Sequence, residues 1–407
     1  MLKIVLNLRK VLTIVICLAG ITTMTAQNVD IYMAGSVGKL GKVWKNNVEL
    51  YSVADGTNSV KFDCTYVLGD DVYIAGTIND GGNTRAAVWK NGSLLYQLTT
   101  DNSNSYANSI SVSGGNVYVC GSHSTNAVVW KNGTITALGQ GYYNSSSDYV
   151  YYYGTAMQVS GDDVYVAGYL GNDRSYNSSM IWKNGTELYS WVQNAVFTDI
   201  AISGDNVYVS GYKKDEFFRY VATVWKNGDE LYSDIAGSEF SSISVSENDV
   251  YVTGYTTNSA SNKVATVWKN GAVLYQLADG ATDTRGDDIC AKDNDIYVLA
   301  RNIVWKNGVE LYDMGSQVVN AICLPSSAAT AIEKIEMQSP QIYPNPVSDK
   351  LFIQSETDIR KFEIYNITGQ QMLTGNIENL KSINVSTLPA GIYVLKMGNY
   401  QGKFVKE

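Results

Sequence analysis

The sequence predicts an all-β protein whose body is a closed ring of seven repeats. The first observation is a tetrapeptide, Trp-Lys-Asn-Gly or a near copy, which starts at Trp44, Trp89, Trp130, Trp182, Trp225, Trp268 and Trp305. The second is a motif of the form Val-Tyr-Val-x-Gly before each copy, with its tyrosine at Tyr32, Tyr73, Tyr118, Tyr165, Tyr208, Tyr251 and Tyr297. Repeats of about 40 to 50 residues with four strand-like runs each are typical of β-propeller blades.

Each repeat is expected to form four antiparallel strands. In the sixth repeat, four strand-like runs follow one another at 241–246, 249–254, 264–269 and 272–277. Asn270-Gly271 joins the last two runs, and Asn-Gly favours a type I′ hairpin because both residues tolerate positive φ. The chain beyond the first 26 residues shows no convincing helical periodicity.

The third observation concerns the two ends of the repeat array. The first repeat begins directly at its second strand, Val29–Gly35, and an extra strand-like run, Val318–Leu324, follows the last repeat. This last run is expected to complete the first blade and to close the ring. Closure removes the open sheet edges that would otherwise invite aggregation.

The chain is expected to contain four segments. The first is a signal peptide, because Lys3, Arg9 and Lys10 precede an apolar run and small residues precede Gln27. The segments are a signal peptide at 1–26, a seven-bladed propeller with four-stranded blades at 27–324, a linker at 325–340 and a small β-sandwich at 341–407. Loss of three positive charges with the signal would lower the formal net charge from −9 to −12. An acidic surface repels phosphate backbones, so we expect no nucleic-acid partner, and we expect no transmembrane segment in the mature chain.

Most recurrent residues have a structural interpretation. The tryptophans and motif tyrosines are expected to pack between blades. Acidic pairs such as Asp70-Asp71 are expected to form hairpin turns. The alternative for these pairs is calcium binding. His123 is the only histidine, so a multi-histidine metal site is excluded. No catalytic residue, metal or cofactor is expected. A disulfide between Cys290 and Cys323 is possible from their positions in the sequence, and both alternatives stay open.

A candidate binding face is expected where the repeats differ. The connections from second to third strands, and from fourth to first, vary in length and emerge on one face, where repeat proteins usually bind ligands. One of them is a tyrosine-rich insertion, Gly139–Gly154. The candidate ligand-binding residues are Tyr142, Tyr143, Tyr151, Tyr152, Tyr153, Tyr176, Phe217, Phe218 and Tyr220. The alternative is that these aromatic side chains pack on the body of the protein.

The leading functional hypothesis is a secreted, surface-displayed and non-enzymatic module that binds a glycan or protein ligand. The alternative is a secreted carbohydrate-active hydrolase or lyase on a propeller scaffold. A loop-face cleft holding two carboxylates about 5 to 10 Å apart would favour the enzyme. An aromatic face without such a pair would favour binding.

The C-terminal segment resembles the type A sorting domain of the type IX secretion system. The resemblance is carried in order by Ile342–Pro346, Leu351–Ile353, Phe362–Asn366 with Gly369, Leu388–Lys396 and Lys403–Lys406. It implies an immunoglobulin-like sandwich that engages the type IX machinery, passage across the outer membrane, and release or attachment at the cell surface. The body resembles uncharacterised Trp-Lys-Asn-Gly repeat propellers of Bacteroidetes-type bacteria, a resemblance that supplies no activity.

Overall fold

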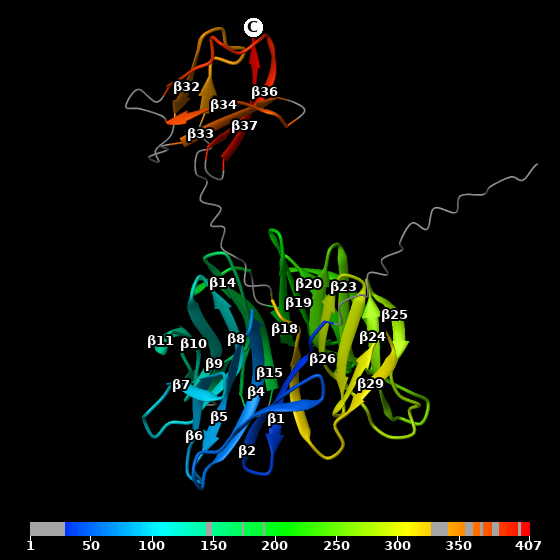
Figure 1. The fold of residues 1–407 in the computed structure, drawn as a ribbon. Helices are drawn as coiled ribbons and strands as arrows, with labels where there is room; N and C mark the ends of the chain where they lie inside the picture. The colour runs from blue at the N-terminus through cyan, green and yellow to red at the C-terminus, as the bar shows by residue number, and fades with distance from the viewer. Residues whose placement is uncertain are drawn as a thin grey trace, which may run out of the picture. The chain divides into compact units, whose positions relative to one another are not determined.

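The computed structural model describes residues 29–143, 149–172, 175–189, 192–326, 341–354, 361–366, 369–376, 382–397 and 400–407. The chain divides into two compact units, one up to Ser326 and one from Ser327. The secondary-structure elements assigned in the described residues are all β-strands, with no helix among them (Figure 1). This confirms the predicted all-β class. The predicted signal peptide, and the linker from residue 327 on, lie outside the described residues. Within those residues, the structure has no helix long and apolar enough to cross a membrane.

In the described part of the first unit, the strands form seven antiparallel sheets, which we call blades 1 to 7. Blade 1 has the order β3 (Val48–Val53), β2 (Leu40–Lys45), β1 (Tyr32–Val37) and β30 (Val318–Cys323). Blade 2 contains β4 (Ser59–Leu68), β5 (Asp71–Asn79), β6 (Thr84–Lys90) and β7 (Ser93–Gln97). Blade 3 contains β8 (Ser105–Ser113), β9 (Asn116–His123), β10 (Asn126–Lys131) and β11 (Thr134–Gly139).

Blade 4 is larger than the others. It contains β12 (Tyr142–Tyr143), β13 (Tyr149–Ser160), β14 (Asp163–Asn172), β15 (Ser175–Lys183), β16 (Thr186–Glu187) and β17 (Val192–Gln193). Blade 5 contains β18 (Ala195–Ser203), β19 (Asn206–Lys214), β20 (Tyr220–Lys226) and β21 (Asp229–Ala236). Blade 6 contains β22 (Glu239–Ser246), β23 (Asp249–Thr257), β24 (Lys263–Lys269) and β25 (Ala272–Gln276). Blade 7 contains β26 (Gly286–Lys292), β27 (Asp295–Ala300), β28 (Ile303–Lys306) and β29 (Val309–Asp313).

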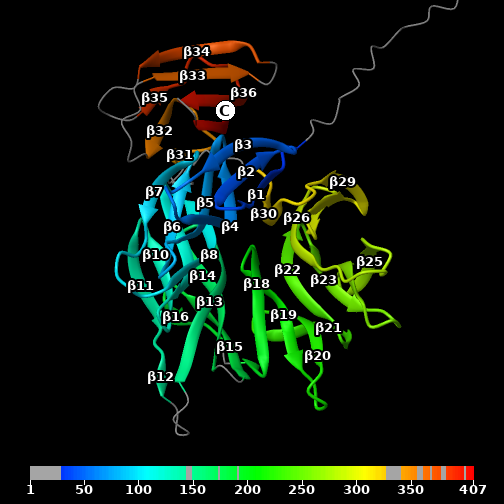
Figure 2. The ribbon, with the colours of Figure 1, turned by 90° about the horizontal axis from the view of Figure 1, so that it is seen from below.

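The seven blades form a ring through one strand each. These inner strands contact one another in succession, from β4 through β8, β13, β18, β22 and β26 to β30, and β30 contacts β4 in turn (Figure 2). The strand β30, from the end of the unit, pairs with β1 from its beginning, so that Cys323 faces Tyr32 and Ile322 faces Met33. The last strand therefore completes the first sheet, and no inner edge is left unpaired at the junction.

Each inner strand contains a β-bulge, where one extra residue stands opposite its neighbouring strand. The extra residues are all polar: Asp63, Asn108, Thr155, Thr198, Ser241, Asp287 and Asn320. The glycine of the Val-Tyr-Val-x-Gly motif lies against this bulge. A Cβ atom on Gly211 would lie 2.0 Å from the carbonyl oxygen of Val196, too close for any side chain. The bulge therefore explains the glycine in six of the seven motifs, Ala300 being the exception.

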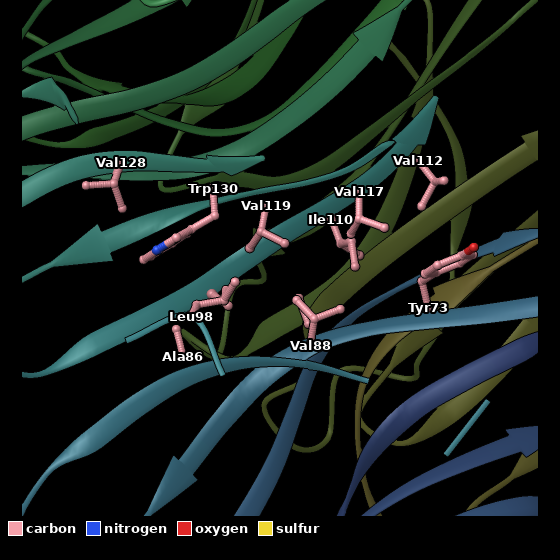
Figure 3. Packing of buried hydrophobic residues seen from close by; sticks show 12 residues of the cluster. Tyr73, Ala86, Val88, Leu98, Ile110, Val112, Val117, Val119, Val128 and Trp130 are labelled. Carbon is pink, nitrogen blue, oxygen red and sulfur yellow. The ribbon is translucent and has the colours of Figure 1, made fainter. Parts of the chain in front are cut away.

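The recurrent tryptophans lie in the core between adjacent blades. Trp130 of blade 3 is fully buried in one cluster with Tyr73 and Val88 of blade 2 (Figure 3). Trp89, Trp225 and Trp268 each contact a phenylalanine of an inner strand, with ring centroids 4.8 to 4.9 Å apart. Packing of large rings between twisted sheets is therefore the role of this repeated position.

The four cysteines among the described residues are free thiols. The Sγ of Cys290 donates to the carbonyl oxygen of Ile322 at 3.4 Å, and that of Cys323 to the carbonyl oxygen of Leu324 at 3.2 Å. Burial raises the pKa of the Cys323 thiol to about 12, so it stays protonated at neutral pH. The Cys290–Cys323 disulfide left open by the sequence is not formed in this structure.

The second unit is a two-sheet sandwich. One sheet has the order β31 (Gln341–Tyr343), β32 (Lys350–Gln354) and β35 (Ser382–Asn384). The other has the order β34 (Gln371–Asn376), β33 (Lys361–Asn366), β36 (Gly391–Met397) and β37 (Tyr400–Lys406). The two sheets enclose a separate core that includes Leu351, Ile364, Leu395 and Phe404. The unit therefore has its own hydrophobic interior, as an independent domain requires.

Candidate functional site

The most conspicuous repeated residues, the lysine and asparagine of Trp-Lys-Asn-Gly, hold a hairpin turn in their own blade. In blade 2, Asn91 Oδ1 accepts from the backbone N–H of Val72 at 2.8 Å, and its Nδ2 donates to Asp71 at 2.8 Å. Lys90 pairs with the same carboxylate at 2.8 Å and lowers the pKa of Asp71. Equivalent ion pairs hold Asp30, Asp163, Asp249 and Asp295. These groups are engaged within the repeat, so the candidate site lies elsewhere.

The tyrosine-rich insertion forms strands and not a loop. In blade 4, β12 pairs with the start of β13, with Tyr142 opposite Val150 and Tyr143 opposite Tyr149. The strand β13 then continues into the body of the blade, pairing Tyr151 with Gly171 of β14. Tyrosine and valine favour strands, and this run extends the inner strand of blade 4. Residues 144–148 of the insertion lie outside the described residues.

One face of this extension presents a row of tyrosine rings, which we call the tyrosine ladder. It consists of Tyr143, Tyr149, Tyr151, Tyr153 and Tyr169. Successive ring centroids are 4.6, 5.1, 6.2 and 4.9 Å apart in that order. Four of the rings are half-buried and the Tyr143 side chain is 71% exposed. The contacts between rings fix their orientation, and Tyr143 forms the exposed end of the row.

Tyr142 and Tyr152 lie on the opposite face, because side chains alternate along a strand. Their rings lie 6.4 Å apart, and Tyr152 packs with Leu138 against blade 3. Burial raises the pKa of Tyr152. The sequence grouped Tyr151, Tyr152 and Tyr153 as neighbours on one surface, whereas the structure separates Tyr152 from the other two. It also adds Tyr149 and Tyr169 to the row, which strand alternation could have indicated.

A second group of aromatic residues belongs to the connection between β19 and β20 in blade 5. Asp215 organises this turn by accepting from the backbone N–H groups of Phe217 at 2.8 Å and Arg219 at 2.9 Å. Phe218 stands at the tip with its side chain 81% exposed and φ of 61°, while Arg219 lies 5.0 Å from the centre of the Phe217 ring. The Tyr220 ring contacts Tyr212 at 5.1 Å. This turn therefore presents its rings on a preformed hairpin.

The remaining candidate, Tyr176, has a described backbone only. It stands opposite Gly171 in the pairing of β14 with β15, and its side chain lies outside the described residues. The pairing places Tyr176 at the same end of blade 4 as the ladder, because Gly171 also faces Tyr151. The predicted proximity of the ladder to the blade 5 turn stays a prediction.

The acidic pair relevant to the enzyme alternative lies on the inner strands. The hydroxyl of Ser242 lies 2.7 Å from Asp199 Oδ2 and 3.0 Å from Asp288 Oδ1. Both carboxyls also accept backbone N–H groups, from Ile243 at 3.0 Å to Asp199 and from Ile322 at 2.9 Å to Asp288. These bonds join the inner strands of blades 5, 6, 7 and 1. The two acids thus act as ties between blades, in a position away from the variable loops.

Comparison with known proteins gives little for the body of the chain, and no curated protein matches it. The crystal structure of a nidogen/laminin complex matches at 8% identity and a TM-score of 0.37, over 74% of this chain and 99% of that one. Trypanosoma rangeli sialidase in complex with sialic acid matches at 10% identity and a TM-score of 0.39, over 90% of this chain and 71% of that one. Prolyl oligopeptidase B from Galerina marginata matches at 11% identity and a TM-score of 0.37, over 89% of this chain and 52% of that one. Scores below 0.5 carry no argument about function.

The second unit gives a definite result. Residues 341–407 match the family of secretion system C-terminal sorting domains. The match covers both sheets of the sandwich and agrees with the resemblance found in the sequence. It indicates that the chain engages the type IX secretion machinery and is exported to the cell surface or the extracellular space.

Proposed function

We propose that the propeller is a non-enzymatic binding module of the exported protein, and that its tyrosine ladder recognises a glycan chain. The observation that carries the proposal is the row of five rings from Tyr143 to Tyr169, held by mutual contacts on the face of the extension opposite Tyr152. Rigid amphipathic rings offer a large contact area at a small entropic cost of ordering.

The chemistry of the ladder favours a neutral and extended ligand. Tyrosine side chains are uncharged at neutral pH and combine an apolar ring with a hydroxyl that donates and accepts hydrogen bonds. Sugar rings present the matching combination of apolar faces and hydroxyl edges. The ladder follows the direction of β13, so several rings can contact successive units of one chain. Surface display after export would expose this row to extracellular polysaccharide.

The hydrolase alternative has less support. Asp199 and Asp288 share one neighbouring group, the hydroxyl of Ser242. Both carboxyls also accept hydrogen bonds from backbone N–H groups. A glycosidase needs one free carboxylic acid and one free carboxylate on either side of a bound sugar. The ladder requires no such pair.

The test is to probe the purified chain on arrays of neutral glycans and of peptides. We expect binding to a neutral glycan, and we expect the double variant Y151A/Y153A to lose about 2 kcal/mol of binding free energy, roughly 30-fold in affinity. If the chain bound peptides and no glycan, the ligand would be a protein and not a glycan. Release of shortened glycan products by the wild-type chain would favour the enzyme instead.

A further inference from the structure

The fourth strands of the blades share a tyrosine that one blade lacks. It stands at Tyr51, Tyr96, Tyr189, Tyr232, Tyr275 and Tyr312 in the other six repeats. Blade 3 has Ala137 at the same distance after its tryptophan, but its strand register differs. Tyr96 faces Val88, the residue before Trp89, whereas Thr136 faces Val129, the residue before Trp130. Blade 3 therefore places the short side chain of Thr136 where its relatives place a phenol ring.

The shared tyrosine has the same place in each interface. Its ring covers the glycine of the Asn-Gly turn in the following blade. A Cβ on Gly92 would meet the Tyr51 ring at 3.0 Å, and the same pairing joins Tyr96 to Gly133 at 3.2 Å. Tyr189, Tyr232 and Tyr275 cover Gly228, Gly271 and Gly308 in the same way. Gly185 of blade 4, which follows the blade with Ala137, has no heavy atom within 4 Å of its Cβ position.

The exposure of a neighbouring residue confirms that this place is open. The apolar residue before the motif tyrosine is buried in six blades, as Ile31, Val72, Val117, Val207, Val250 and Ile296. Its counterpart in blade 4, Val164, is only half-buried. In blade 3 the corresponding Val117 belongs to the same apolar cluster as the Tyr96 ring. In blade 4, Val164 is therefore not covered by a tyrosine ring from the preceding blade.

The vacant place is a pocket of about 250 Å³ between blades 3 and 4. Its lining includes Val129 and Leu138 from blade 3 and Val164, Val166, Asn184 and Gly185 from blade 4. The pocket is smaller than the roughly 300–1,000 Å³ of sites for drug-sized ligands, which suits a single ring. Val164, Val166 and Gly185 correspond to Val117, Val119 and Gly133, which surround Tyr96 one interface earlier.

We propose that this pocket binds the phenol ring of a tyrosine side chain presented by a partner polypeptide. At five other interfaces of this ring, a tyrosine ring from the chain itself covers the corresponding glycine. The side chains that would contact the ring are already in place. The proposal is independent of the tyrosine ladder, because it uses β11, β14 and the turn at Gly185 and none of the ladder residues.

The experiment uses p-cresol, which is the tyrosine side chain without its backbone, and the capped tripeptide Gly-Tyr-Gly. Methyl NMR of the purified chain should show saturable shifts at Val129, Leu138, Val164 and Val166 with both probes, at concentrations up to about 10 mM. The variant T136Y supplies the missing ring in cis, from a residue that lines the pocket opposite Val129. We expect it to weaken binding of both probes at least tenfold and to raise the melting temperature.

The matched control opens an equivalent pocket elsewhere. The variant Y232A removes the ring that covers Gly271, and we expect p-cresol to bind there and to recover part of the lost melting temperature. If T136Y does not fold, T136F provides the same test. Unchanged binding of p-cresol to T136Y and T136F, or no methyl shifts in the wild-type chain, would overturn the proposal. Binding of p-cresol without binding of the tripeptide would overturn the assignment to a polypeptide partner.

Discussion

Asp199 and Asp288, from blades 5 and 7, point at the same hydroxyl group, that of Ser242 in blade 6, at 2.7 and 3.0 Å. A hydroxyl has one proton, so Ser242 can donate a hydrogen bond to only one of the two carboxyls and must accept a hydrogen bond from the other. The shorter contact is to Asp199. Burial raises the pKa of Asp288 to about 7, with the nearby charge of Asp199 as a further cause. Burial raises the pKa of Asp199 as well. We infer a chain in which protonated Asp288 donates to Ser242 and Ser242 donates to the carboxyl oxygen of Asp199.

This arrangement predicts a loss of stability as the pH rises. Between the ordinary pKa of an unfolded aspartate, near 4, and about 7, the folded chain holds a proton on Asp288 that the unfolded chain releases. The free energy of unfolding should therefore be highest at the acid end of this window, fall as the pH rises towards 7 and level off above it. The fall between pH 5 and pH 8 should be roughly 2 to 3 kcal/mol. Urea unfolding at pH 5 and pH 8 measures the difference. The variant D288N cannot ionise and should lose most of this slope; an unchanged slope would refute the inferred proton.

The glycine of the Val-Tyr-Val-x-Gly motif is predicted to be intolerant of any side chain. The variant G211A places a Cβ 2.0 Å from the carbonyl oxygen of Val196, so the bulge in β18 must move. We expect a loss of about 3 kcal/mol or more in the free energy of unfolding, at the upper end of single substitutions. Ala300 holds the corresponding position in blade 7, and A300G serves as the control with a small effect. Equal stability of G211A and the wild type would show that the bulge does not determine the motif.

Closure of the ring by β30 is predicted to be essential for folding. This strand pairs with β1, and Asn320 Nδ2 donates to the carbonyl oxygen of Phe62 in blade 2 at 2.7 Å. A chain ending at Met314 lacks the strand and exposes the edges of blades 1 and 7, so we expect aggregation. A chain ending at Ser326 keeps the strand and should stay soluble and folded by circular dichroism. A soluble, cooperatively unfolding chain that ends at Met314 would contradict the closure.

The two faces of β13 are predicted to respond differently to truncation of their tyrosines. Tyr152 packs with Leu138 in the core between blades 3 and 4, so Y152A should cost about 2 to 3 kcal/mol of stability. Tyr151 belongs to the ladder, and Y151A should cost less than about 1 kcal/mol. Thermal unfolding of the two variants makes the comparison. Greater destabilisation by Y151A would mean that the ladder is a packing element.

Most of the fold could be predicted because its determinants are local. The Asn-Gly turns and the two motifs mark the strands of each blade, and the unpaired runs at Val29 and Val318 imply closure. The bulges could not be predicted, because the extra residue, such as Asp63 or Asn320, is defined only against its neighbouring strand. The direction of Tyr152 required knowledge that the insertion is strand. The shared tyrosine of the fourth strands was not singled out from the sequence, and only the structure shows what it covers and that Thr136 takes its place in blade 3.

Binding of a glycan by the tyrosine ladder can be tested on two neighbouring residues. Tyr143 belongs to the ladder and Tyr142 lies on the opposite face of the same short strand, 71% and 44% exposed. The measurement is the affinity of the wild type, Y143A and Y142A for the best glycan on the array, by isothermal titration calorimetry. We expect Y143A to weaken binding about tenfold or more and Y142A to stay within about twofold of the wild type. Equal affinities for all three chains, or a loss confined to Y142A, would contradict it.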